Sequence, residues 1–284
     1  MNAVGVQISG VLPSRDITVH QLKGKRLAID THLIIHQYLL STPSLDKFGR
    51  TTNHLVGVFH HVTHLLSLGI KPVYVFDGSF LEIRKHEKFV KDASQPRVTS
   101  VLSLEMINET KALITALGVP VVQAPAEGDA QAAHMCVKGD VFAVASTQYD
   151  ALMYGAKRIV MNLRRLSKKV QLYELKEVLA SCKMDHNQFV MFCMLIGTDF
   201  NPAVENQKNA LRFVQKYRTF TRTFEKIKWQ YGYLPKAVYE HIKTMPVTNK
   251  YQLRYGPVDK EVVKRILVEH GMSEKRIWSV LDKI

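Results

Sequence analysis

The chain has 284 residues, of which 46% are hydrophobic and 23% are charged. That composition provides for a sizeable core and excludes wholesale disorder. Lysine and arginine exceed the acidic residues by 39 to 25, a formal charge of +14. Such a surplus favours a polyanionic partner, usually nucleic acid, over a generally basic surface. Three cysteines without a C-x-x-C pair exclude a disulfide framework. The longest apolar stretch, 189–196, is too short to cross a membrane.

Three short apolar runs predict buried strands, at residues 26–30, 73–77 and 141–146. Apolar residues at helical spacing between the runs predict helices over 53–68 and 104–117. This alternation is typical of an α/β protein with a largely parallel sheet that is covered by helices on both faces. Ligands of such sheets gather at the carboxyl ends of the strands.

The segment from 79 to about 103 is polar and basic, and we expect it to project from the sheet as a helix and a connection. Arg84 and Lys91 are seven residues apart, so they share one face if the segment is helical. A solvated surface helix is the alternative interpretation of this charge run. Residues 201–284 are predicted to be helical and contain 17 Lys and Arg against 8 Asp and Glu, so most of the positive surplus lies there.

Carboxylates recur at the ends of the predicted elements, next to apolar runs. If they share one pocket, they repel one another and require cations. Oxygen ligands suit Mg²⁺ or Mn²⁺, and two such ions can drive phosphodiester hydrolysis. The alternative for the pair at 127 and 129 is a helix start with acidic residues. The candidate ligands are Asp30, Asp77, Glu127, Asp129, Asp150 and Asp199.

Six sequence blocks, in order along the chain, resemble the motifs of the flap endonuclease family. Several motifs of four or more residues in register are far more specific than one short pattern. The blocks are residues 4–7, 23–30, 75–78, 124–132, 149–156 and 197–202.

The resemblance implies a central mixed sheet with helices on both sides and a helical arch over the site. It implies a nuclease core over 1–200 and a helical DNA-binding region over 201–284. One metal ion would be held by Asp77 and Asp129, with Asp30 and Glu127 around it, and a second by Asp150 and Asp199. Asp77 and Asp129 thereby count as catalytic, together with Arg84 and Lys91, which would steer the scissile phosphate. Residues expected to contact DNA are Gly5, Arg84, Lys91, Lys208 and Arg212.

The chain departs from the family pattern in several places. Gln148 stands where the family has an aspartate, which predicts weaker binding of the second ion. Residues 203–209 lack the glycines of the family's duplex-gripping hairpin, so Lys208 and Arg212 are expected to compensate by charge. The arch is shorter than usual. No Gln-x-x-Leu-x-x-Phe-Phe motif occurs, which leaves a sliding-clamp partner open.

Three functions compete at this point. The first is an active metal-dependent nuclease that cuts 5′ flaps or branched DNA in replication and repair, which the six acidic residues favour. The second is a catalytically weakened member that binds branched nucleic acid or scaffolds partners, which Gln148 and the missing glycines favour. The third is an RNA-cleaving relative on the same fold. We expect a monomer inside the cell, in the nucleus of a eukaryote or the cytoplasm of an archaeon.

Overall fold

The computed structural model describes residues 6, 8, 12–40, 45–46, 48–78, 102–163 and 168–284. The predicted arch therefore lies almost wholly outside the described residues, and so do Gly5, Arg84 and Lys91. No helix within the described ranges is long and apolar enough to span a bilayer.

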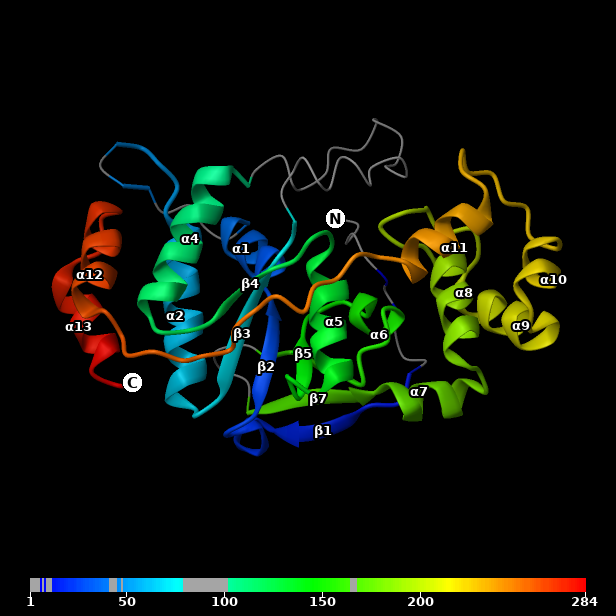
Figure 1. Cartoon of the computed structure of the whole chain (residues 1–284), viewed down its shortest axis with the longest axis horizontal. Coiled ribbons are helices and arrows are strands. Elements are labelled where there is room, and N and C mark those ends of the chain that lie inside the picture. The colour runs from blue at the N-terminus through cyan, green and yellow to red at the C-terminus, as the bar shows by residue number, and fades with distance from the viewer. Residues whose placement is uncertain are drawn as a thin grey trace.

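A seven-stranded sheet forms the centre of the described chain, in the order β1-β7-β6-β5-β2-β3-β4 (Figure 1). The five strands from β6 to β4 are mutually parallel, whereas β7 pairs antiparallel with both β6 and β1. The predicted mixed, mostly parallel sheet is thus confirmed. The strands are β1 (Arg15–Thr18), β2 (Arg26–Asp30), β3 (Lys71–Phe76), β4 (Val121–Gln123), β5 (Ala143–Ala145), β6 (Arg158–Met161) and β7 (Lys169–Glu174).

Strand side chains alternate between two apolar clusters, one on each face of the sheet. Along β2, Ala28 packs into one cluster, whereas Leu27 and Ile29 pack into the other. Along β3, Val75 packs into the same cluster as Ala28, and Phe76 packs into the cluster of Leu27 and Ile29. Both faces are apolar because helices cover both, which is why the strands appear in the sequence as continuous hydrophobic runs.

The Leu27 face is covered mainly by helices of the N-terminal part of the chain. The predicted helices at 53–68 and 104–117 are confirmed, because α2 spans Asn53–Ser67 and α4 spans Leu104–Ala116. Helix α2 turns Leu55, Phe59 and Val62 into the core at helical spacing. The other helices of this layer are α1 (Thr31–Leu39), α12 (Lys260–Glu269) and α13 (Glu274–Leu281), with the short turn η1 (Val19–Leu22) beside them.

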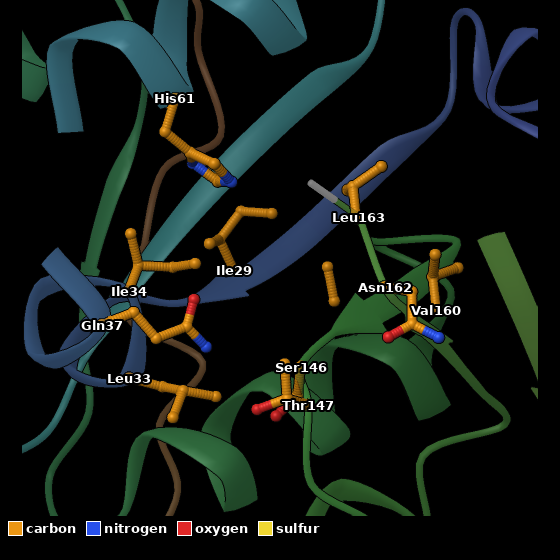
Figure 2. A pocket seen from close by; sticks show the side chains of 11 residues that line it. Ile29, Leu33, Ile34, Gln37, His61, Ser146, Thr147, Val160, Asn162 and Leu163 are labelled. Carbon is orange, nitrogen blue, oxygen red and sulfur yellow. The ribbon is translucent and has the colours of Figure 1, made fainter. Parts of the chain in front are cut away.

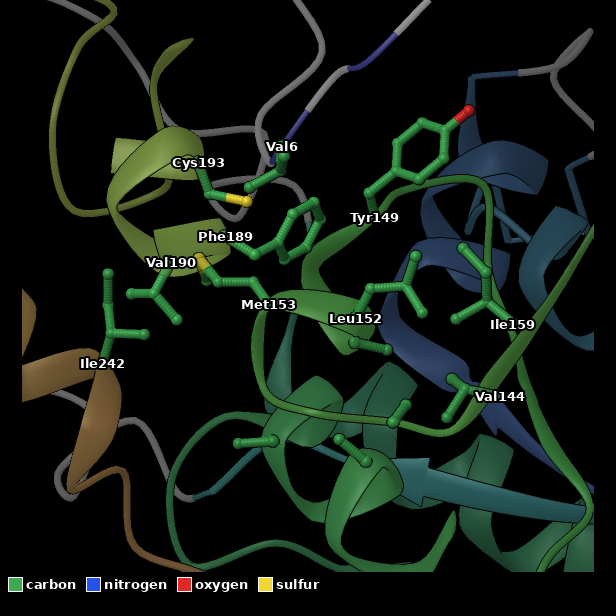
Figure 3. Close-up of a cluster of buried hydrophobic side chains, with 14 of the residues drawn as sticks. Val6, Val144, Tyr149, Leu152, Met153, Ile159, Phe189, Val190, Cys193 and Ile242 are labelled. Atoms are coloured by element: carbon green, nitrogen blue, oxygen red, sulfur yellow. The ribbon is translucent and has the colours of Figure 1, made fainter. Parts of the chain in front are cut away.

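The Ala28 face is covered by later helices, whose buried residues form one continuous cluster with the strands (Figure 3). Helix α8 lies at the centre of this layer, with seven successive residues from 189 to 195 buried. The helices are α5 (Gly128–Lys138), α6 (Asp150–Met153), α7 (Leu175–Cys182), α8 (His186–Ile196), α9 (Gln207–Tyr217), α10 (Phe220–Phe224) and α11 (Pro235–Lys243).

The region after residue 200 is helical, as predicted, but its two halves lie at opposite ends of the molecule (Figure 1). Helices α9 and α11 pack against α8, whereas α12 contacts α4 and α13 contacts α2. An extended segment joins the halves and is held where Gly256 N–H donates to Gly118 O at 2.9 Å and Asp259 N–H to Ala116 O at 2.7 Å. The division of the chain into two domains at residue 200 stays a prediction.

Candidate active site

Five aspartates gather at the carboxyl edge of the sheet, where ligands of parallel sheets bind. Each is positioned by the end of an element. Asp30 is the last residue of β2, and Asp77 directly follows β3. Asp129 lies in the first turn of α5, Asp150 begins α6 after β5, and Asp199 follows α8.

The charges of these carboxylates act on one another and raise the pKa of three of them. Burial and the charge of Asp77 raise the pKa of Asp30 to about 6. Burial and the charge of Asp199 raise the pKa of Asp150 to about 8. Burial raises the pKa of Asp129 well above its usual range, and the charges of all four other aspartates add to the effect. A cation bound among these carboxylates would relieve the repulsion between their charges.

Asp77 is the exception among these carboxylates. Burial by itself would raise its pKa, but the charge and hydrogen bond of His32 and the N–H of Gly128 outweigh burial and lower it. The His32 Nδ1 atom lies 2.7 Å from Asp77 Oδ2, and Gly128 N–H donates to Asp77 Oδ1 at 2.7 Å. Burial in turn depresses the pKa of His32, but Asp77 more than compensates and raises it. Asp77 is therefore the carboxylate held ionised by its surroundings.

Two glycines bring the end of β3 against the start of α5. Gly78 N–H donates to Ala126 O at 2.6 Å, and a Cβ at Gly78 would lie 2.6 Å from Pro125 O. A Cβ at Gly128 would lie 2.7 Å from Asp77 Oδ1. Both contacts are closer than a side chain allows, so the geometry of Asp77 depends on glycine at these two positions.

Asp150 is tied to the N-terminal segment. Val6 N–H donates to Asp150 Oδ2 at 2.8 Å, and Tyr149 N–H donates to Val6 O at 3.2 Å. Val6 belongs to the same buried cluster as Phe189 and Cys193 (Figure 3). The chain next to the predicted DNA contact Gly5 thus reaches the carboxylates, although Gly5 itself lies outside the described residues.

Asp199 is placed by a compact turn at the end of α8. Gly197 adopts a φ of +101°, and Thr198 Oγ1 donates to Asn201 Oδ1 at 2.8 Å. The Asn201 side-chain amide donates back to Met194 O at 2.7 Å. These contacts close the turn and direct Asp199 to the cluster, where its charge raises the pKa of Asp150.

Glu127 stands two residues before Asp129 in the sequence. It is the N-cap residue of α5, and its charge acts on the hydroxyl of the half-buried Tyr154. Burial raises the pKa of Tyr154 well above its usual range, and the charges of Asp150 and Asp199 reinforce the shift. Gln148, two residues before Asp150, is half-buried and donates its backbone N–H to Ser146 Oγ at 3.2 Å.

The donor set fits a hard divalent cation. All of the gathered acidic side chains present oxygen, which Mg²⁺ and Mn²⁺ prefer as a ligand atom. Asp129 Oδ1 is buried and has no hydrogen-bond partner, and such an orphaned carboxylate oxygen suits an ion. Within the described part of the chain, no group of three or more His, Cys, Asp or Glu side chains is already drawn together at metal-ligand spacing.

The predicted DNA-contacting residues Lys208 and Arg212 are exposed on α9, one helical turn apart. Helix α9 lies beyond α8, at the end of the molecule farthest from α12 and α13 (Figure 1). The other predicted contacts, Arg84 and Lys91, lie outside the described residues.

Neither of two cavities is the site of the chemistry. One of about 30 Å³ lies beside β2 and α1, with Gln37, Ser146 and Thr147 in its wall, and it has room for roughly one water (Figure 2). A larger one of about 260 Å³ lies among α5, α6, α8 and α11. Tyr154 lines the larger cavity, but none of the five aspartates lines either.

His32 is the site residue that the motifs did not reveal. It lies in the first turn of α1, two residues after Asp30, so a helix start placed it beside the ends of β2 and β3. The available signal was this position next to a candidate ligand, but a histidine there is usually structural.

Comparisons with known proteins agree with this arrangement. Residues 7–96 match the XPG N-terminal domain, and residues 118–199 match the XPG I-region. Fold and site together define an XPG-type nuclease, a hydrolase of phosphodiester bonds. The chain belongs to the flap endonuclease family, which confirms the resemblance seen in the sequence. Enzymes of this family depend on divalent metal ions.

Flap endonuclease 1 of Hyperthermus butylicus is 36% identical over 99% of this chain and 94% of its own length. The Staphylothermus marinus protein is 32% identical with the same coverage. The structure of flap endonuclease-1 from Methanococcus jannaschii superposes with a TM-score of 0.87 at 31% identity, covering 98% of this chain and 97% of that one. The catalytic core of Rad2 in complex with DNA substrate, at 19% identity and a TM-score of 0.78, shares the fold.

Proposed function

We propose that this chain hydrolyses phosphodiester bonds at the base of 5′ flaps and related branched DNA, with Mg²⁺ or Mn²⁺ held by the aspartate cluster. The observation that carries the proposal is the convergence of five aspartates, from five separate elements, at the carboxyl edge of the sheet. Charges that repel one another in this way are maintained for a cation, since they destabilise the protein without one.

Two ions are expected. Asp77 and Asp129 would hold one, with Asp30 and Glu127 around it, and Asp150 and Asp199 would hold the other. When bound, such ions supply an activated water and neutralise charge on the leaving oxygen. The residues of the chain fix the donors in place: Gly128 N–H orients Asp77, and Val6 N–H orients Asp150. Gln148 is neutral where the family has an aspartate, so the second ion would be bound more weakly.

Branched DNA is the proposed partner. Lys208 and Arg212 are exposed on α9, where they can contact the phosphate backbone of a duplex. Gly5, Arg84 and Lys91 are proposed to contact the DNA, with Arg84 and Lys91 steering the scissile phosphate. Solved structures of the Rad2 catalytic core contain DNA substrate, and one of human GEN1 contains a Holliday junction. We propose a monomer that acts inside the cell, whereas a sliding-clamp partner is left open.

The experiment is a substrate comparison. End-labelled 5′-flap DNA, a matched blunt duplex and the free single strand are incubated with the enzyme and Mg²⁺, and separately with Mn²⁺. The proposal predicts preferred cutting at the base of the flap. Equal cutting of all three DNAs would contradict structure specificity. Preference for the matching RNA flap would instead favour the RNA-cleaving alternative.

A further inference from the structure

We propose that His32 is a positioning residue that holds the Asp77 carboxylate in the orientation needed to bind a divalent cation. The inference deepens the proposed function and rests on it. It assigns a role to a side chain that none of the sequence motifs includes.

The first observation is the way in which Asp77 is held. His32 Nδ1 lies 2.7 Å from one carboxylate oxygen, and Gly128 N–H lies 2.7 Å from the other. A carboxylate has about four lone-pair directions, so these two contacts fix its plane and leave lone pairs on both oxygens for an ion. A ligand that is oriented by hydrogen bonds in this way binds metal more tightly than a free one.

The second observation is that the His32 ring is itself fixed. Its side chain is only 17% exposed. The ring packs edge-on against the Phe76 ring, with 5.9 Å between the ring centroids and an interplanar angle of 81°. The helix turn that bears it is capped by Asp30 Oδ1, which accepts from Leu33 N–H at 3.1 Å. The same helix turn therefore positions both the Asp30 carboxylate and the imidazole that contacts Asp77.

The third observation separates positioning from direct ligation. His32 Nδ1 is the atom that engages Asp77, whereas Nε2 is buried without a hydrogen-bond partner among the described atoms. A positioning role needs Nδ1, whereas a nitrogen ligand already bonded to Asp77 through Nδ1 would have to bind the ion through Nε2. Asparagine presents its amide nitrogen near the position of Nδ1, and glutamine presents its own near that of Nε2, so the two substitutions distinguish the two roles.

The test measures Mn²⁺ binding to DNA-free protein from the electron paramagnetic resonance of free Mn²⁺, which does not depend on cleavage. His32→Ala is expected to weaken Mn²⁺ binding by about 10- to 100-fold, as does the loss of other residues that hydrogen-bond to metal ligands. His32→Asn should retain affinity within a factor of a few, and His32→Gln should behave like alanine. Gln37→Ala, on the exposed side of the same helix, is the matched control and should bind as the wild type. Circular dichroism verifies that each variant is folded.

A double-mutant cycle with Asp77→Asn distinguishes a loss that acts through Asp77 from a folding defect caused by His32→Ala. If His32 acts through Asp77, its replacement should add no further loss in that background. Wild-type affinity in His32→Ala, or equal losses in the asparagine and alanine variants, would overturn the role of His32 and leave the proposed function intact. Retention by glutamine alone would overturn it in favour of direct ligation. No Mn²⁺ binding by the wild type would overturn both proposals.

Discussion

The Asp77 carboxylate and the backbone N–H of Gly128 lie 2.7 Å apart and join the end of β3 to the first turn of α5. A Cβ at residue 128 would lie equally close to the same oxygen. Gly128→Ala should therefore displace Asp77 and lower the cleavage rate at least tenfold, while overpacking costs about 1–3 kcal/mol of stability. Single-turnover cleavage and urea unfolding measure the two effects.

The control for that substitution is Gly232→Ala, because the added Cβ there meets nothing within 4 Å and the backbone is not in the left-handed region. It should leave cleavage unchanged. Equal rates for the Gly128 variant and the wild type would show that the close approach of Asp77 to α5 is not needed for activity.

Gln148→Asp should strengthen binding of the second ion. The residue is half-buried two positions before Asp150, so a carboxylate there would add charge and an oxygen ligand. The Mg²⁺ concentration for half-maximal cleavage should fall several-fold, whereas the neutral Gln148→Asn control should not move it. An unchanged Mg²⁺ titration of the aspartate variant would place this side chain away from the second ion.

The stability of the metal-free protein should fall as pH rises. Asp30 and Asp150 have folded-state pKa values of about 6 and about 8, above those of an unfolded chain. The folded state therefore binds the extra protons, and this stabilisation is complete at low pH and lost as pH rises through those values. Since one pKa unit is worth about 1.4 kcal/mol, the loss should be on the order of a few kcal/mol.

Urea unfolding in the presence of a chelator, between about pH 5 and about pH 9, measures this loss. Asp150→Asn should flatten the pH dependence because residue 150 then cannot ionise, and saturating Mn²⁺ should flatten it for the wild type. Parallel curves for wild type and variant would mean that Asp150 does not carry the effect.

Lys208→Ala combined with Arg212→Ala should weaken duplex binding. Each lost phosphate contact reduces the salt slope of log affinity by about one, so the pair should reduce it by about two. Fluorescence anisotropy across a salt series measures the slope. Lys275→Ala with Lys283→Ala removes equal charge from the exposed C-terminal end and serves as the control. Equal slopes in both double variants would indicate that α9 has no special part in binding.

The sequence pattern was sufficient to predict those strands and helices whose own residues show a hydrophobic run or helical spacing. The runs ending at Asp30 and Asp77 are buried strands because helices cover both faces, and both aspartates fall at the carboxyl edge, as parallel strands require. The convergence of Asp150 and Asp199 with them came from resemblance, because α6 and α8 reach the cluster through tertiary packing that no local pattern encodes.

Two features escaped sequence analysis for physical reasons. His32 was missed because its role depends on Asp77, forty-five residues away, and not on its neighbours. The separation of α9–α11 from α12–α13 was missed because both segments are basic and amphipathic. Which apolar surface each one covers is decided by packing on α8 or on α2 and α4.

The most direct test of the account is single-turnover cleavage of end-labelled 5′-flap DNA by the wild type and by Asp77→Asn, with Mg²⁺ and with Mn²⁺. We predict cutting at the base of the flap with either ion. Because a bound metal supplies several kcal/mol of transition-state stabilisation, the variant should be roughly 100-fold slower or worse, while its DNA binding persists. Comparable cleavage by Asp77→Asn would contradict the assigned metal site. Tight binding without cutting by the wild type in either ion would contradict the proposed activity and leave a recognition protein.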